Sequence, residues 1–178
     1  MDHSAHATQL SSVAAMALSG FALAAVVPGV MWPLRRASLW ERVSLPPGVA
    51  LPLLVLLHGW AMLAGLMRPM PTAVTMVSEL LLLPAAVAFW APVVVRTRHR
   101  LSDPGACLYL FLAVPLLDLP VLGVIAAGHS VEGLAMIVGM LPLGIAAAAV
   151  TWSWISREER QAADALPLAL RGGDPHGR

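Results

Sequence analysis

The sequence predicts an all-α fold: a polytopic membrane helical bundle of five transmembrane helices, with the N-terminus outside and the C-terminus cytoplasmic. Composition indicates this first, because 58% of the 178 residues are hydrophobic and only 12% are charged, about half the charged fraction of an ordinary soluble domain. At about 20 residues per span, the long apolar runs provide for five crossings of a bilayer. The position of every arginine then indicates the orientation.

The apolar runs are separated by short polar connectors. The first run lacks a basic segment before it and a small-residue cleavage site after it, so we expect a retained span and no cleaved signal peptide. Residues 1–9 are predicted to be an extracytoplasmic tail and residues 157–178 a poorly ordered cytoplasmic tail. The five expected spans within the bundle (10–156) are 10–33, 46–66, 72–95, 103–127 and 133–156.

Helix signals support several of these boundaries. The segment Met67–Pro71 contains two prolines and is expected to turn the chain between the second and third spans. Thr72 is a suitable N-cap for the third span. Asp103 followed by Pro104 is typical of a helix start, here that of the fourth span.

All eleven basic residues are arginines, and they are distributed unequally. With five spans, alternate connectors lie on the same side of the membrane. One side then holds only Arg68, whereas the other holds Arg35, Arg36, Arg42, Arg96, Arg98, Arg100, Arg157, Arg160 and the two arginines of the C-terminal tail. The positive-inside rule places this second side in the cytoplasm.

Several classes of protein are disfavoured. A net charge of +1 indicates no nucleic-acid partner. Cys107 is the single cysteine, which excludes an internal disulfide framework. The sequence contains no Ser-His-Asp order, P-loop, dinucleotide fingerprint or paired-cysteine zinc motif, so we do not expect an enzyme.

Sulfur and imidazole side chains gather toward the predicted outer side. Thioethers and imidazoles together suit copper, and thioethers favour the cuprous state. Residues three or four positions apart share a helix face, and three such pairs occur: His58 with Met62, Met76 with Glu79, and Met136 with Met140. The predicted metal ligands are His3, His6, His58, Met62, Met67, Met70, Met76, Glu79, His129, Met136 and Met140.

The same residues also fit roles other than a shared copper site. Methionines commonly fill irregular packing space without binding a metal. An intramembrane histidine, glutamate and aspartate are best explained by mutual pairing, so His58 could hydrogen-bond to Glu79 or Asp118. The start Met1-Asp2-His3 could form a square-planar nitrogen set for cupric ion, with a solvated tail as the alternative. His58 as a haem ligand is a further, less favoured interpretation.

From residue 50 to residue 157 the chain resembles the membrane-integral CtaG family of bacterial cytochrome c oxidase assembly proteins. The similar segments are LLHGW, MVSELLLLPAAVAFWAPVV, RLSDPGACLYLFLAVPLLDLPVLG and VEGLAMIVGMLPLG, in this order. The resemblance implies a role in copper delivery to an oxidase. The sequence departs from the family's H-x-x-E-H motif, because Met76, Glu79 and Leu80 stand at the three positions. Usual members also have about two more spans.

Two functions follow as expectations. The first is a copper-binding protein that assists copper delivery to, or assembly of, a respiratory cytochrome c oxidase or another copper-containing membrane complex. The second is an accessory subunit that packs against such a complex without binding metal. For this second function, small residues such as Gly20, Gly59, Gly65, Gly133 and Gly139 could let helices approach closely.

Overall fold

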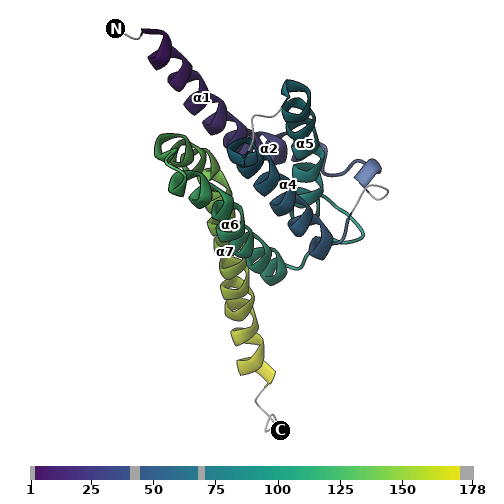
Figure 1. The fold of residues 1–178 in the computed structure, drawn as a ribbon. Helices are drawn as coiled ribbons and strands as arrows, with labels where there is room; N and C mark the ends of the chain where they lie inside the picture. The colour runs from purple at the N-terminus through teal and green to yellow at the C-terminus, as the bar shows by residue number, and fades with distance from the viewer. Residues whose placement is uncertain (1–2, 41–44, 68–70, 173–178) are drawn as a thin grey trace, which may run out of the picture.

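The computed structural model describes residues 3–40, 45–67 and 71–172, and at 3–9, 12, 65–67, 72 and 165–172 it describes the backbone alone. Every regular element in this part of the chain is a helix (Figure 1), which confirms the predicted all-α class. In chain order the elements are α1 (His3–Phe21), the π-helix η1 (Ala22–Val26), α2 (Val27–Met31), α4 (Pro47–Met67), α5 (Thr72–Val94), α6 (Asp103–Ala126) and α7 (Ser130–Gly172).

Five helices in the described part are long and apolar enough to cross a membrane, as the sequence predicted. The first span joins α1, η1 and α2, and the other four are α4, α5, α6 and the first part of α7. Large apolar side chains remain exposed along the spans: Leu56, Leu80, Leu108 and Ile145 are 68–73% exposed. Such a surface suits contact with lipid, so the chain is a multi-pass membrane protein.

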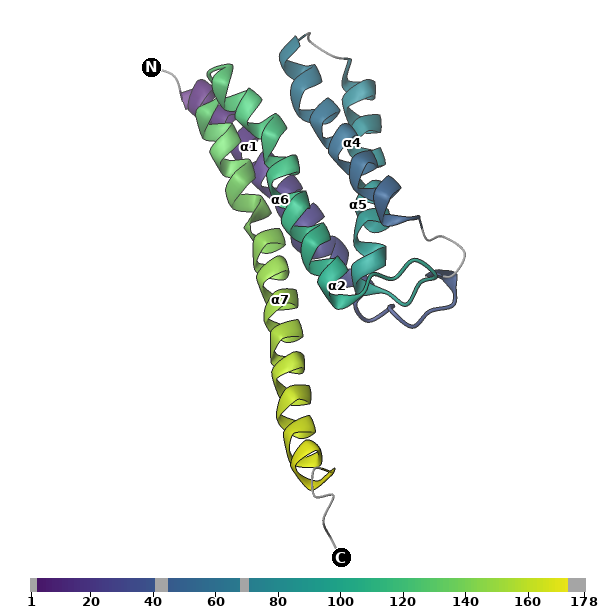
Figure 2. The ribbon, with the colours of Figure 1, turned by 90° about the horizontal axis from the view of Figure 1, so that it is seen from below.

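Helix α7 extends further than the sequence predicted. We expected it to end near residue 156, whereas its 43 residues continue to Gly172. A helix of this length measures about 65 Å, twice the thickness of a bilayer's hydrocarbon core, and Figure 2 shows it projecting beyond the other helices. The extension is rich in Glu, Arg, Gln, Ala and Leu, which have high helix propensity. At the other terminus α1 begins at His3, within the segment expected to be a tail.

One ion pair ties α7 to the start of α6. The Arg157 guanidinium lies 2.7 Å from the Asp103 carboxylate. The connectors 32–46 and 95–102 meet at this same end of the bundle, where the backbone amide of Arg96 donates to the carbonyl of Arg35 over 3.2 Å. We call this the arginine end, and the other end, which carries the turn 127–129, the opposite end.

The helices form two groups, visible in Figure 2. Helices α1 and α6 both pack against α7, whereas α4 and α5 form a hairpin. The hairpin joins the first group through α4, which packs on α6, and through α5, which packs on α2. In the half of α5 near the opposite end, residues 73–81 include no buried side chain.

The π-helix η1 has an identifiable cause and a tertiary partner. Pro28 has no amide hydrogen, and just before it the amide of Val27 donates five residues back, to Ala22, instead of four residues back, to Leu23. The Leu23 carbonyl therefore has no amide donor within its own helix. The indole Nε1 of Trp90, which is 2% exposed, donates to this carbonyl over 2.9 Å. The bond joins α5 to the first span.

Trp90 belongs to a buried aromatic cluster that extends this junction to α6. Phe89 packs edge-on against Trp90 and stacks on Tyr109, with ring centroids 5.4 and 5.0 Å apart. The Tyr109 hydroxyl donates to the carbonyl of Phe89 over 3.1 Å. Both buried aromatic polar groups are thus satisfied by backbone oxygens.

The substitution Trp90→Phe should lower the free energy of unfolding by about 1–3 kcal/mol, because it leaves the Leu23 carbonyl without a donor inside the bundle. Unfolding in mixed detergent micelles, followed by circular dichroism, measures this change. Trp152→Phe is the matched control, because Trp152 is 73% exposed and makes no hydrogen bond to a described residue. Equal effects of the two substitutions would contradict the proposed junction.

Close approach of α1 to α7 depends on glycine. A Cβ atom at Gly139 would collide with the backbone carbonyl of Ala17, and one at Gly20 would lie 3.0 Å from the sulfur of Met136. Small residues at such crossings let helix backbones pack directly against each other in membranes.

Gly139→Ala should therefore separate α1 from α7 and destabilise the bundle by about 1–3 kcal/mol. Gly144→Ala tests the helix-propensity effect alone, because a Cβ there meets nothing within 4 Å. We expect it to be neutral or slightly stabilising. The same unfolding assay compares the two, and a harmless Gly139→Ala would show that the crossing is not tight.

Candidate metal-ligating and ionisable residues

The structure distributes the predicted metal ligands over separate helix surfaces. Among the described residues, no group of three or more His, Cys, Asp or Glu side chains lies close enough to hold a metal ion. His3, His6 and Met67 lie in helices whose side chains are not described at these positions, and Met70 lies outside the described residues. The remaining predicted ligands occupy three places: the α4–α6 contact, one surface of α5, and α7 with the turn before it.

His58 lies in the middle of α4 and is fully buried. Neither ring nitrogen has a hydrogen-bond partner among the described residues, although the imidazole interacts electrostatically with the backbone carbonyl of Leu117 in α6. Helix α6 comes close because Gly59 has no side chain, and a Cβ there would lie 3.3 Å from Pro120. The predicted pairing of His58 with Glu79 or Asp118 is therefore wrong in this structure. Met62, one turn further along α4, is partly buried against the core.

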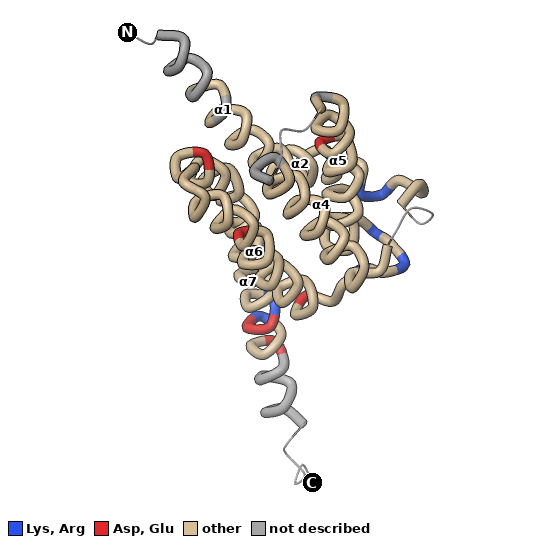
Figure 3. The backbone as a smooth tube through the Cα atoms, viewed as in Figure 1, with Lys and Arg blue, Asp and Glu red and all other residues tan. Residues whose placement is uncertain are grey.

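Met76 and Glu79 lie together on the exposed half of α5. Met76 is 64% exposed, and Glu79 is exposed as well. Figure 3 shows one acidic position on this half of α5 and, among the residues that it describes, no basic position beside it. Both residues belong to a membrane-spanning segment, where a charged side chain facing lipid costs about 2.5–3.5 kcal/mol on insertion scales. The pair is thus accessible from the side of the bundle and lacks a partner within the described residues.

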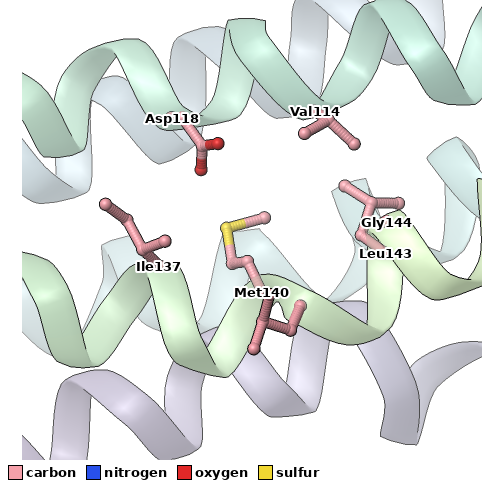
Figure 4. A pocket seen from close by; sticks show the side chains of 7 residues that line it. Val114, Asp118, Ile137, Met140, Leu143 and Gly144 are labelled. Carbon is pink, nitrogen blue, oxygen red and sulfur yellow. The ribbon is translucent and has the colours of Figure 1, made fainter.

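A second thioether–carboxylate pair was not predicted from the sequence. Asp118 of α6 points its carboxylate toward the thioether of Met140 in α7, across a cavity of about 80 Å³ (Figure 4). Asp118 makes no hydrogen bond or ion pair with any described residue. The volume is sufficient for a water molecule or a small cation. The other lining residues are apolar, among them Val114 and Ile137.

Sequence reasoning placed Asp118 with His58 because both residues lie at middle depth. It did not predict that Asp118 lies beside Met140, because the packing of α6 on α7 decides which α6 residues face α7. The backbone carbonyl of Leu117 lies next to His58 of α4, whereas the side chain of the next residue, Asp118, faces α7. The sequence did contain a signal for this pair: Asp118 is an acidic residue within one span, and Met140 lies at a comparable depth in the next span.

The expected stripe of His129, Met136 and Met140 is interrupted. His129 is exposed in the turn before α7, where its amide donates to Val124 and its carbonyl accepts from Gly133. Met136 is fully buried and faces Gly20 of α1. Met140 is 7% exposed and faces α6. The three side chains therefore do not form one site.

Comparison of the chain with protein-family models, with curated proteins and with solved structures finds no match.

Substitution of the buried His58 tests whether its imidazole contributes to the stability of the bundle. An imidazole without a hydrogen bond costs about 1–3 kcal/mol when buried, so His58→Leu should raise the free energy of unfolding by about 1 kcal/mol. Met62→Leu is the control, because a volume-conserving exchange on the same helix face should change stability little. If His58→Leu destabilises the detergent-solubilised protein by more than 1 kcal/mol, the imidazole makes a stabilising contact, for which the nearby Leu117 carbonyl is the first candidate.

Proposed function

We propose that the protein is a bacterial inner-membrane factor that assists copper delivery to, or assembly of, a respiratory cytochrome c oxidase. Its resemblance to the CtaG family over residues 50–157 supports the oxidase as the recipient. The single structural observation that favours it is the exposed pair Met76 and Glu79 on the unpacked half of α5. A thioether and a carboxylate on an open surface can bind a cuprous ion together with ligands from a second protein.

Transfer of a copper ion between two proteins requires a donor site whose set of ligands is incomplete. A metal held by few ligands on an exposed surface can accept a ligand from a partner before it leaves its donor. The pair Met140 and Asp118 would add an interior position at the α6–α7 cavity. His129 is exposed in the turn at the opposite end, the same end at which α4 finishes, at Met67. By the positive-inside rule this end faces outward, the side on which an extracytoplasmic copper donor would work.

The exposed half of α5 also favours a second candidate function. Its surface combines large apolar side chains with one carboxylate, as a surface that another membrane protein covers would. An accessory subunit could use this surface to dock without binding metal. Metal analysis separates the two candidates.

Copper binding is tested on the purified full chain by competition with a cuprous chelator under reducing conditions. We expect Met76→Leu and Met140→Leu each to lower the apparent copper affinity by about tenfold or more, since loss of even an outer-shell partner costs about 10–100-fold. Met31→Leu is the control, because Met31 is buried near the arginine end, away from both pairs. Equal, negligible copper in all samples would exclude the copper function. Co-purification with an oxidase in that case would favour the accessory subunit.

A further inference from the structure

An apolar groove of about 690 Å³ lies between α4 and α5. Its walls come from Leu53 and Leu57 of α4 and from Leu81, Ala88 and Ala91 of α5. Several of these side chains are small, which leaves the space between the helices unfilled. The groove plays no part in the copper chemistry proposed above, because neither Met76 nor Glu79 lines it.

The length of the groove matches one leaflet of a membrane. Ala91 and Leu81 are ten residues apart on one helix, which corresponds to about 15 Å. This is half of the roughly 30 Å hydrocarbon core of a bilayer. One end of the groove lies at the arginine end, next to Trp40, and the other lies near the middle of the span.

Trp40 lines the groove at its arginine end. Its indole Nε1 donates to the carbonyl of Leu34 over 2.7 Å, and the side chain is 9% exposed. The donor is thus satisfied by the connector, and the ring contributes an apolar surface. Tryptophan is enriched at this depth, where hydrocarbon meets headgroups.

Positive charge is concentrated at the end of the bundle to which this end of the groove opens. None of the described arginines in the connectors 32–46 and 95–102 forms a salt bridge with a described acidic residue. Arg35 stacks over the ring of Trp32, 4.3 Å from its centroid. The amide bond from Arg96 to Arg35 holds the two connectors together, and Figure 3 shows their basic positions on the side of the bundle that carries α4 and α5. Asp103, an acid of the same end, is paired with Arg157. The described arginines of these connectors are Arg35, Arg36, Arg96, Arg98 and Arg100.

We propose that the α4–α5 groove binds an anionic phospholipid, with one acyl chain between the helices and the phosphate on the connector arginines. Basic pockets between transmembrane helices at the positively charged side of a membrane bind anionic headgroups in this way. Arginine presents a planar set of donors that matches phosphate oxygens. The apolar groove and the arginines each supply what one part of the same molecule requires.

A second apolar cavity differs from the groove in its distance from the connector arginines. A cavity of about 550 Å³ lies between α4 and α6, lined by Leu56, Trp60 and Leu63 among others. It is also apolar, but most of its α4 residues, Gly59, Trp60, Leu63 and Ala64, lie beyond the middle of the helix from the arginine end. We expect it to contact lipid without selecting a headgroup.

The test is native mass spectrometry of the full chain in detergent, titrated separately with phosphatidylglycerol and phosphatidylcholine of the same acyl chains. We expect one phosphatidylglycerol to remain bound at concentrations where phosphatidylcholine does not. Each basic residue near an anionic surface contributes about a factor of five in affinity. The double substitution Arg96→Gln with Arg98→Gln should therefore weaken phosphatidylglycerol binding by about thirtyfold and leave phosphatidylcholine binding unchanged.

Two further variants test the apolar groove independently of the connector arginines. Ala88→Trp fills the groove and should weaken both lipids, whereas Leu63→Trp, in the α4–α6 cavity, should weaken neither specifically bound lipid. If Ala88→Trp fails to fold, the arginine double variant decides alone, because its side chains are exposed. Equal retention of both lipids by the unmodified chain, retention of neither, or an unchanged arginine double variant would each overturn the proposal.

Discussion

The bundle depends on one constraint of the bilayer, namely that a backbone carbonyl without water must find a donor within the protein. Pro28 follows the π-helix η1, in which the Leu23 carbonyl loses its helical donor, and Trp90 supplies another from α5. This hydrogen bond fixes the depth at which the α4–α5 hairpin meets the first span. The stack of Phe89 on Tyr109 carries the junction to α6. This junction joins the two helix groups near the arginine end, and the packing of α4 on α6 joins them further along the bundle.

The same junction explains what the other half of the hairpin leaves open. Since α5 packs on α2 only near the arginine end, its residues 73–81 have no buried side chain. Met76 and Glu79 become accessible there. The groove between α4 and α5 lies in the other half of the hairpin, toward the arginine end. A candidate surface for a protein partner and a candidate site for a lipid thus lie at opposite depths of the same hairpin.

The predicted ligands separate because neighbouring residues on a helix face different helices. His58 of α4 meets only the backbone carbonyl of Leu117 in α6, whereas the side chain of Asp118 faces α7 and Met140. Spacing within one helix correctly placed Met76 beside Glu79, since this pair depends on helix geometry alone. Spacing could not bring together residues on different spans, because the rotation of each span about its axis is set by its neighbours. Depth alone therefore suggested a cluster of His58, Glu79 and Asp118 that the packing does not form.

The sequence by itself determined the helical class and the five spans, because a run of about 20 apolar residues has few other stable conformations in lipid. It also located the arginine-bearing connectors from the side chains alone. Tertiary structure decided the π-helix partner, the burial of His58 without a hydrogen bond, and the pairing of Asp118 with Met140. These features depend on contacts between spans distant in sequence. A run of apolar residues specifies that a helix lies in lipid, but not which of its faces contacts other helices of the protein.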